Sequence, residues 1–139
     1  MKIQSCTLDS ILRTLPLPPP ESGGIIGGKC NIVSAYICDT MPAKQIHDEC
    51  YFPNVEFLNE SIRIWSEQGI EFYGVFHSHF IGTDLSVGDT KYIEKIMMNM
   101  PGSISELFFP IIVSCQMIGY KATKYDSKVV ITKDDIIIV

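Results

Sequence analysis

The sequence has no dense cluster of lysine and arginine, no Cys-x-x-C pair and no uninterrupted apolar run of 18 residues. With a net charge of −5 and no basic patch, the chain has little electrostatic support for binding nucleic acid. The lack of a long apolar run argues against a membrane-spanning helix. Residues 1–6 lack the basic-then-apolar pattern of a signal peptide. We therefore expect a cytoplasmic protein that binds neither nucleic acid nor membrane, and the oligomeric state stays open.

Disulfide bonds are also not expected. The five cysteines are odd in number and scattered, and in a cytosolic chain they are most simply free thiols. Cys38 and Cys115 lie in apolar runs, which predicts that both fill the core. The length of 139 residues and the 46% apolar content predict a single domain, residues 1–139, with a substantial core.

Periodicity of the apolar residues predicts a mixed order of helices and strands. The expected helices span residues 7–15, 53–68 and 87–100, and the expected strands span residues 21–29, 31–38, 70–77, 107–114, 116–124 and 128–139. Residues 28–31 suit a hairpin turn, and Gly69 suits the end of a helix. This order predicts an α/β fold with three layers, in which helices flank one mixed β-sheet.

Two of the three histidines stand two residues apart at the end of the apolar run 70–77. Residues i and i+2 of a strand point to the same face, so His77 and His79 can reach one metal ion. Asp89, at the first turn of the expected third helix, faces the positive end of the helix dipole and stays ionised. Two imidazoles and one carboxylate leave a fourth position open on a tetrahedral ion, as catalytic zinc sites do. We therefore expect one Zn²⁺ per chain, bound by these three residues.

A zinc-activated water needs a base, and Glu21 is the best candidate because it stands at the edge of a strand that can lie beside His77. The Ser86 hydroxyl is a candidate to stabilise an oxyanion. Each residue also has a purely structural interpretation. The histidines can be structural, Ser86 and Asp89 can form a capping box, and Glu21 can be an exposed carboxylate at a strand end. His47 has no partner at ligand spacing and is expected at the surface.

Together these residues resemble the signature of the JAMM or MPN-type (JAB-like) zinc metalloproteases. That signature is a glutamate on an early strand, then His-[Ser/Thr]-His, then Ser-x-x-Asp on a following helix; Glu21, residues 77–79, Ser86 and Asp89 match it. Residues 21–27, ESGGIIG, also resemble the Glu-[Thr/Ser]-Gly-Gly-x-x-Gly of bacterial members. The resemblance covers residues 8 to about 125 in the order of elements.

The resemblance implies a cytidine-deaminase-like JAMM architecture and an isopeptidase or peptidase that cleaves after the C-terminal Gly-Gly of a ubiquitin-like or sulfur-carrier-like protein. It implies His77, His79 and Asp89 as zinc ligands, Glu21 as general acid/base and Ser86 as oxyanion stabiliser. The chain departs from the family in two places. The loop 80–85 has one residue fewer than usual, and Phe80 stands where proline is usual. Asp84, in the middle of that loop, is an alternative ligand.

Two other functions follow from the same residues. A non-catalytic MPN-like scaffold would keep the fold and use its surface to bind proteins, although this chain retains every ligand of the signature. A nucleoside or base deaminase would need H-x-E together with P-C-x-x-C, and the sequence has no P-C-x-x-C.

Overall fold

The computed structural model describes residues 1–40 and 51–139, and the expected surface position of His47 lies outside these residues. In chain order the elements are β1 (Lys2–Ile3), α1 (Ser5–Thr14), β2 (Gly23–Lys29), β3 (Ile32–Cys38), α2 (Val55–Glu67), β4 (Glu71–Ser78), α3 (Val87–Asn99), β5 (Glu106–Phe108), β6 (Ile111–Val113), β7 (Gln116–Ile118), β8 (Tyr120–Tyr125), β9 (Lys128–Lys133) and β10 (Ile137–Ile138).

The three predicted helices are confirmed. Local signals mark the ends of α2 and the start of α3. The N-cap residue of α2 is Asn54, whose side chain accepts a hydrogen bond from the Phe57 N–H. The helix is followed by Gly69 at φ +73°, a left-handed conformation that glycine adopts without strain. Ser86 caps α3. No helix among the described residues is long and apolar enough to cross a membrane.

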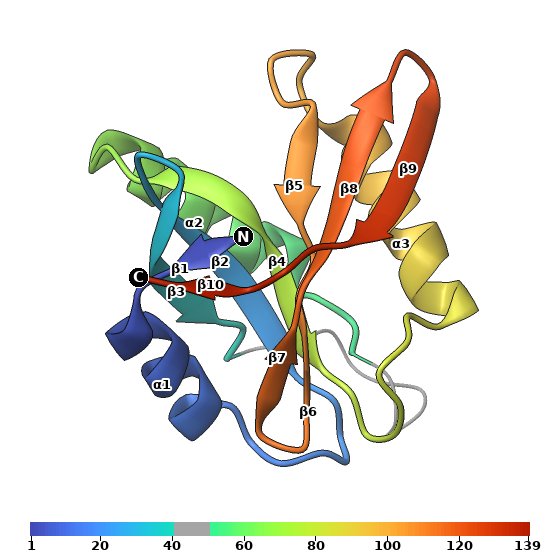
Figure 1. Ribbon diagram of the computed structural model, residues 1–139. Helices are drawn as coiled ribbons and strands as arrows, with labels where there is room; N and C mark the ends of the chain where they lie inside the picture. The colour runs from blue at the N-terminus through green and yellow to red at the C-terminus, as the bar shows by residue number, and fades with distance from the viewer. Residues whose placement is uncertain (41–50) are drawn as a thin grey trace.

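The strands form one curled mixed sheet (Figure 1). Their order is β10-β1-β3-β2-β4-β5-β8-β9, with β6 paired to β4 and β7 paired to β6. Strand β2 is antiparallel to both β3 and β4, whereas β5 and β6 run parallel to β4 along successive parts of its length. The predicted hairpin turn between β2 and β3 is confirmed, with Cys30 and Asn31 at φ 54° and 61°.

Three of the predicted strands are each divided into two shorter strands in the structure. Residues 107–114 form β5 and β6, which are separated at Phe109-Pro110, where proline has no N–H to donate to a ladder. Residues 116–124 divide at Gly119 into β7 and β8, and residues 128–139 form β9 and β10. The prediction that Cys115 fills the core was wrong. It lies exposed in the β6–β7 turn at φ 59°.

Helices cover both faces of the sheet. On one face, Ile26 of β2 and Phe76 of β4 pack with Ile11 of α1, and all three are fully buried. On the other face, their neighbours Ile25 and Val75 join the cluster that contains residues of α2 and α3. Because successive strand residues face opposite ways, β2 and β4 contribute to both clusters, as expected of strands covered on both sides. The predicted mixed sheet flanked by helices is confirmed.

Candidate metal centre

The end of β4 holds the two histidines on a rigid support. The His77 N–H donates to the Pro110 carbonyl at 3.3 Å, and the His79 N–H donates to the Ile112 carbonyl at 2.8 Å. These contacts with β6 and the residue before it keep the chain extended just past the last residue of β4. Both imidazoles therefore lie on the same side, with their ring centroids 4.8 Å apart.

Asp89 meets these imidazoles from the first turn of α3. Its Oδ1 lies 3.2 Å from His77 Nε2, and its Oδ2 lies 2.9 Å from His79 Nε2. The same carboxylate accepts the Ser86 N–H at 2.8 Å, while Ser86 Oγ accepts the Asp89 N–H at 3.0 Å. The capping box and the approach to the histidines are thus combined rather than alternative, since one helix start provides both.

Asp84, the alternative ligand, does not join this group. Its side chain is 87% exposed and lies 3.8 Å from Lys133 Nζ, although Asp84 lines the same surface hollow as the two histidines and Asp89. Its position in the middle of the loop turns it toward solvent, whereas the capping interaction holds Asp89 toward the histidines.

The donor set fits a divalent metal ion. The ligand atoms of His77, His79 and Asp89 lie within 4.8 Å of one another. The Nε2 atom of His77 is buried and has no hydrogen-bond partner among the described residues; its 3.2 Å approach to Asp89 is an ion-pair distance only. A metal ion would satisfy this buried nitrogen. Imidazole and carboxylate donors suit zinc and related first-row metals.

The contacts within this group shift the pKa values of Asp89 and His79. Burial alone would raise the pKa of Asp89, but the contacts with His77 and His79 outweigh it and hold the pKa well below its usual range. The hydrogen bond to Asp89 raises the pKa of His79, against the opposing effect of burial. Asp89 is therefore ionised and available as a ligand at neutral pH.

Glu21 comes to the same place from the strand beside β4. The Ser22 N–H donates to Ser78 Oγ at 2.9 Å, and the Ser78 N–H donates to the Ser22 carbonyl at 2.7 Å. These two bonds hold the residue before β2 against the end of β4. Glu21 Oε1 accepts the Phe80 N–H at 3.4 Å. Burial raises the pKa of Glu21, although His77 and the Phe80 N–H partly oppose this. Sequence reasoning left Ser78 without a role; its small hydroxyl between two histidines was the available signal.

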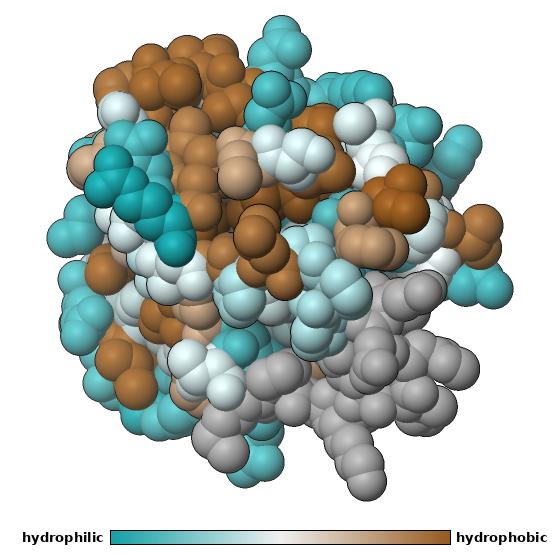
Figure 2. Space-filling view, turned by 90° about the horizontal axis from the view of Figure 1, so that it is seen from below, coloured by the Kyte–Doolittle hydropathy of each residue, from teal (hydrophilic) through white to brown (hydrophobic). Residues whose placement is uncertain are grey.

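A hollow of about 420 Å³ connects these groups. Its lining includes Glu21, His77, His79, Ser86 and Asp89, so the five candidate residues share one cavity. The other walls are largely apolar and aromatic, with Tyr51, Phe52, Pro53, Val75, Ile81, Tyr92, Ile93 and Phe109. Figure 2 shows apolar side chains interspersed with polar ones on the face seen from below.

Tyr51 is a wall residue that sequence reasoning missed. Its hydroxyl donates to Asp39 Oδ2 at 2.8 Å, and its ring lies against Gly23, where a Cβ atom would come within 2.7 Å of the ring. Burial, then the hydrogen bond to Asp39, raises the pKa of Tyr51 far above its usual value. The contacts of Tyr51 with Asp39 and Gly23 join residues that are separated in the sequence, so no local pattern predicted them.

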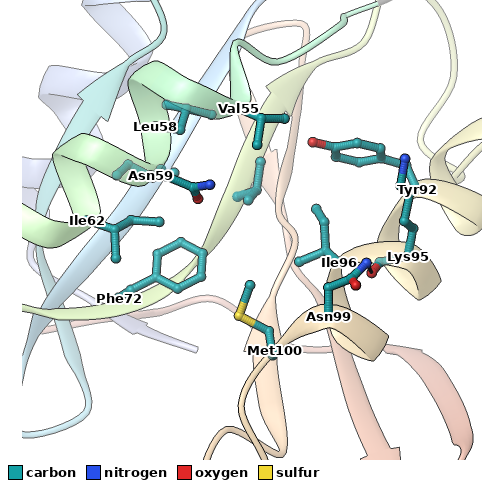
Figure 3. A pocket seen from close by; sticks show the side chains of 12 residues that line it. Val55, Leu58, Asn59, Ile62, Phe72, Tyr92, Lys95, Ile96, Asn99 and Met100 are labelled. Atoms are coloured by element: carbon teal, nitrogen blue, oxygen red, sulfur yellow. Dashed lines mark hydrogen bonds between the residues drawn. The ribbon is translucent and has the colours of Figure 1, made fainter.

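A second hollow of about 340 Å³ lies between α2 and α3 (Figure 3). It meets the first hollow at Val75 and Tyr92, which line both. Its other walls are mainly aliphatic, and no histidine or carboxylate of residues 1–40 and 51–139 lines it. Among the described residues, the candidate metal ligands therefore line only the hollow at the end of β4.

No protein-family model and no curated protein matches the chain. Solved structures do match it. Protein DSY2949 from Desulfitobacterium hafniense has a TM-score of 0.70 at 15% identity, over 99% of this chain and 92% of that one. A protein from Salinibacter ruber has a TM-score of 0.59 at 18% identity, over 100% and 92%. AF2198, a JAB1/MPN domain protein from Archaeoglobus fulgidus, has a TM-score of 0.53 at 14% identity, over 99% of each chain. At these identities the similarity establishes an MPN-like fold.

Proposed function

We propose that this protein is a zinc-dependent isopeptidase or peptidase that cleaves after the C-terminal Gly-Gly of a ubiquitin-like or sulfur-carrier-like protein. The observation that carries the proposal is the convergence of Glu21, His77, His79, Ser86 and Asp89 in one hollow. These residues come from distant parts of the chain, and they match the signature by residue type and order. The MPN-like fold supports the same conclusion, and a cytidine-deaminase-like layering of the sheet and helices is part of the proposal.

In this proposal His77, His79 and Asp89 hold the zinc ion. When bound, zinc would act as a Lewis acid that lowers the pKa of a coordinated water toward neutrality. Three protein ligands would leave an open position for that water. Two observations support this: the ligand atoms of the three side chains lie within 4.8 Å of one another, and His77 Nε2 is buried.

Glu21 is the proposed proton carrier. As a carboxylate it takes a proton from the attacking water, and as a carboxylic acid it gives that proton to the leaving amine. Its partial burial raises its pKa above the ordinary value, which makes the protonated form easier to reach. Ser86 is the proposed oxyanion donor. Its Oγ accepts the Asp89 N–H, and its own O–H can donate to the developing oxyanion.

The substrate tail is proposed to lie extended along the hollow, in the manner of an added strand. Glycines at the scissile junction would let the tail backbone approach the metal ligands closely. Apolar wall residues such as Phe52 and Ile81 are 41% and 79% exposed, and they offer contacts to side chains further along the tail.

The experiment compares the parent with Glu21→Gln on a small ubiquitin-like protein whose Gly-Gly end is joined to a reporter, either by a linear peptide bond or through a lysine isopeptide bond. We expect Glu21→Gln to retain about one zinc per chain and to lose cleavage by roughly 10²–10⁴-fold, the usual contribution of a general acid/base. Glu71→Gln is the matched control, because Glu71 is an exposed carboxylate at the far end of β4.

Two outcomes would contradict the proposal. If Glu21→Gln cleaves as fast as the parent, Glu21 is not the proton carrier. If the parent is folded, binds no metal and cleaves neither linkage, the protein is better described as an MPN-like scaffold that binds other proteins. The comparison of the two linkages also establishes whether an isopeptide or a linear peptide bond is the substrate.

A further inference from the structure

The loop 80–85, which joins one candidate zinc ligand to the helix that carries another, is anchored to the core. The Tyr120 hydroxyl donates to the Thr83 carbonyl at 2.6 Å. Tyr120 is the first residue of β8 and is 6% exposed, and its ring belongs to the apolar cluster beneath α2 and α3. A buried aromatic ring has few alternative positions, so its hydroxyl fixes the loop backbone at this point.

The residue before Thr83 contacts a candidate ligand directly. Nδ1 of His79 lies 3.3 Å from the carbonyl oxygen of Gly82. A carbonyl oxygen can only accept, so this contact requires a proton on Nδ1, and Nε2, which contacts Asp89, is the nitrogen that a metal ion would take. Partners of this kind fix the tautomer and the ring orientation of histidines that bind metals.

Gly82 is suited to this position by its backbone conformation. It has φ +87°, a region that residues with a side chain rarely adopt. Nothing lies within 4 Å of the place where its Cβ atom would be. Glycine therefore suits this position because of its backbone conformation and not because space is short. That conformation sets the direction in which the Gly82 carbonyl points.

We propose that Tyr120 is a positioning residue for the metal centre, which acts through the backbone of Thr83 and Gly82 to orient the His79 imidazole toward the metal. The inference rests on the proposed zinc site and adds to it a residue of β8, two strands away from β4 in the sheet. One other side-chain contact of this loop is an ion pair, and it is weaker. The Lys133–Asp84 pair is 3.8 Å long and both side chains are largely exposed, so it contributes little to holding the loop.

The test compares Tyr120→Phe with Tyr73→Phe in the full chain. Tyr73→Phe is matched, because its hydroxyl also contacts loop backbone, accepting the Asn31 N–H at 3.0 Å at the β2–β3 turn. Zinc affinity is measured by competition with a chromophoric chelator, and the visible spectrum of the Co²⁺-substituted protein reports the geometry of the ligands. Thermal unfolding of the metal-free proteins measures any general loss of stability.

We expect Tyr120→Phe to raise the zinc Kd about 10-fold, at the lower end of the effect of outer partners of metal ligands, and to alter the Co²⁺ spectrum. Tyr73→Phe should leave both unchanged. Gly82→Ala, in an exposed loop, should also raise the zinc Kd while the metal-free protein remains folded.

Different failures are distinguishable. If the parent binds zinc and Tyr120→Phe binds it equally well with the same Co²⁺ spectrum, the positioning role is wrong and the proposed function stands. The same conclusion follows if Tyr73→Phe raises the Kd as much as Tyr120→Phe does, because the effect is then general. If the parent binds no zinc, both this inference and the proposed function are overturned.

Discussion

Replacing Asp89 with asparagine removes a negatively charged candidate ligand while the size and shape of the side chain stay nearly the same. In the structure this carboxylate lies 2.9 Å and 3.2 Å from the Nε2 atoms of His79 and His77. An asparagine oxygen can still accept the Ser86 N–H, so the start of α3 should form as before. The substitution therefore separates metal binding from the local fold.

The expected effect can be worked out as a change in thermal stability. Zinc at about 100 times its Kd stabilises a folded protein that binds one ion by about 2.7 kcal/mol. For 139 residues, an unfolding entropy of about 2.1 cal/mol/K per residue converts 1 kcal/mol into about 3.5 °C. The parent should therefore gain about 9 °C in Tm on adding zinc.

Loss of an outer partner costs roughly 10–100-fold in metal affinity, so loss of a charged ligand should cost at least about 100-fold. At the same free zinc concentration the Asp89→Asn variant would then be about half saturated. Zinc would stabilise it by only about 0.4 kcal/mol, which corresponds to a rise in Tm of about 1.5 °C. Differential scanning calorimetry with buffered zinc measures both shifts, each against the metal-free form of the same protein.

Asp84→Asn is the control, because Asp84 is an exposed carboxylate in the neighbouring loop. It should show the full shift of the parent. If Asp89→Asn also shows the full shift, Asp89 is not a ligand. If Asp84→Asn loses the shift and Asp89→Asn does not, the ligand is Asp84, and the geometry of the capping box does not mark the metal site.

Zinc affinity should fall as the pH is lowered, because His79 must be neutral to bind a metal and a lower pH protonates it. Since the hydrogen bond to Asp89 raises the pKa of His79, the fall should begin at a higher pH than for an unperturbed imidazole with a pKa of about 6.5. Chelator competition between about pH 8 and about pH 5.5 measures this, and a constant Kd would contradict it. Asn54→Ala removes the cap that accepts the Phe57 N–H at 3.1 Å and should lower the stability of the metal-free protein by about 1 kcal/mol. Urea denaturation checks this prediction; zinc affinity should be unchanged, and an equal midpoint for the two proteins would show that the cap adds no net stability.

Local chemistry explains which parts of the fold were predictable. The ends of α2 and α3 follow from short-range signals, namely a capping residue at Asn54, a glycine at position 69 and a capping box at Ser86. The hairpin between β2 and β3 follows from four residues. The strands after α3 were less predictable. Their apolar runs are continuous, whereas the breaks at Pro110 and Gly119 depend on which neighbouring strand each segment pairs with.

By itself the sequence determined that His77 and His79 share a face, because side chains alternate along any strand. It also placed Asp89 at a helix start, because Ser86 and Asp89 have the spacing of a capping box. Only the tertiary structure decided that Asp89 rather than Asp84 meets the histidines, and that Ser78 holds the segment of Glu21 beside them. Likewise, no periodicity indicated that Tyr120 would reach the loop. These contacts join residues far apart in sequence, so they depend on strand pairing and packing, which local patterns do not encode.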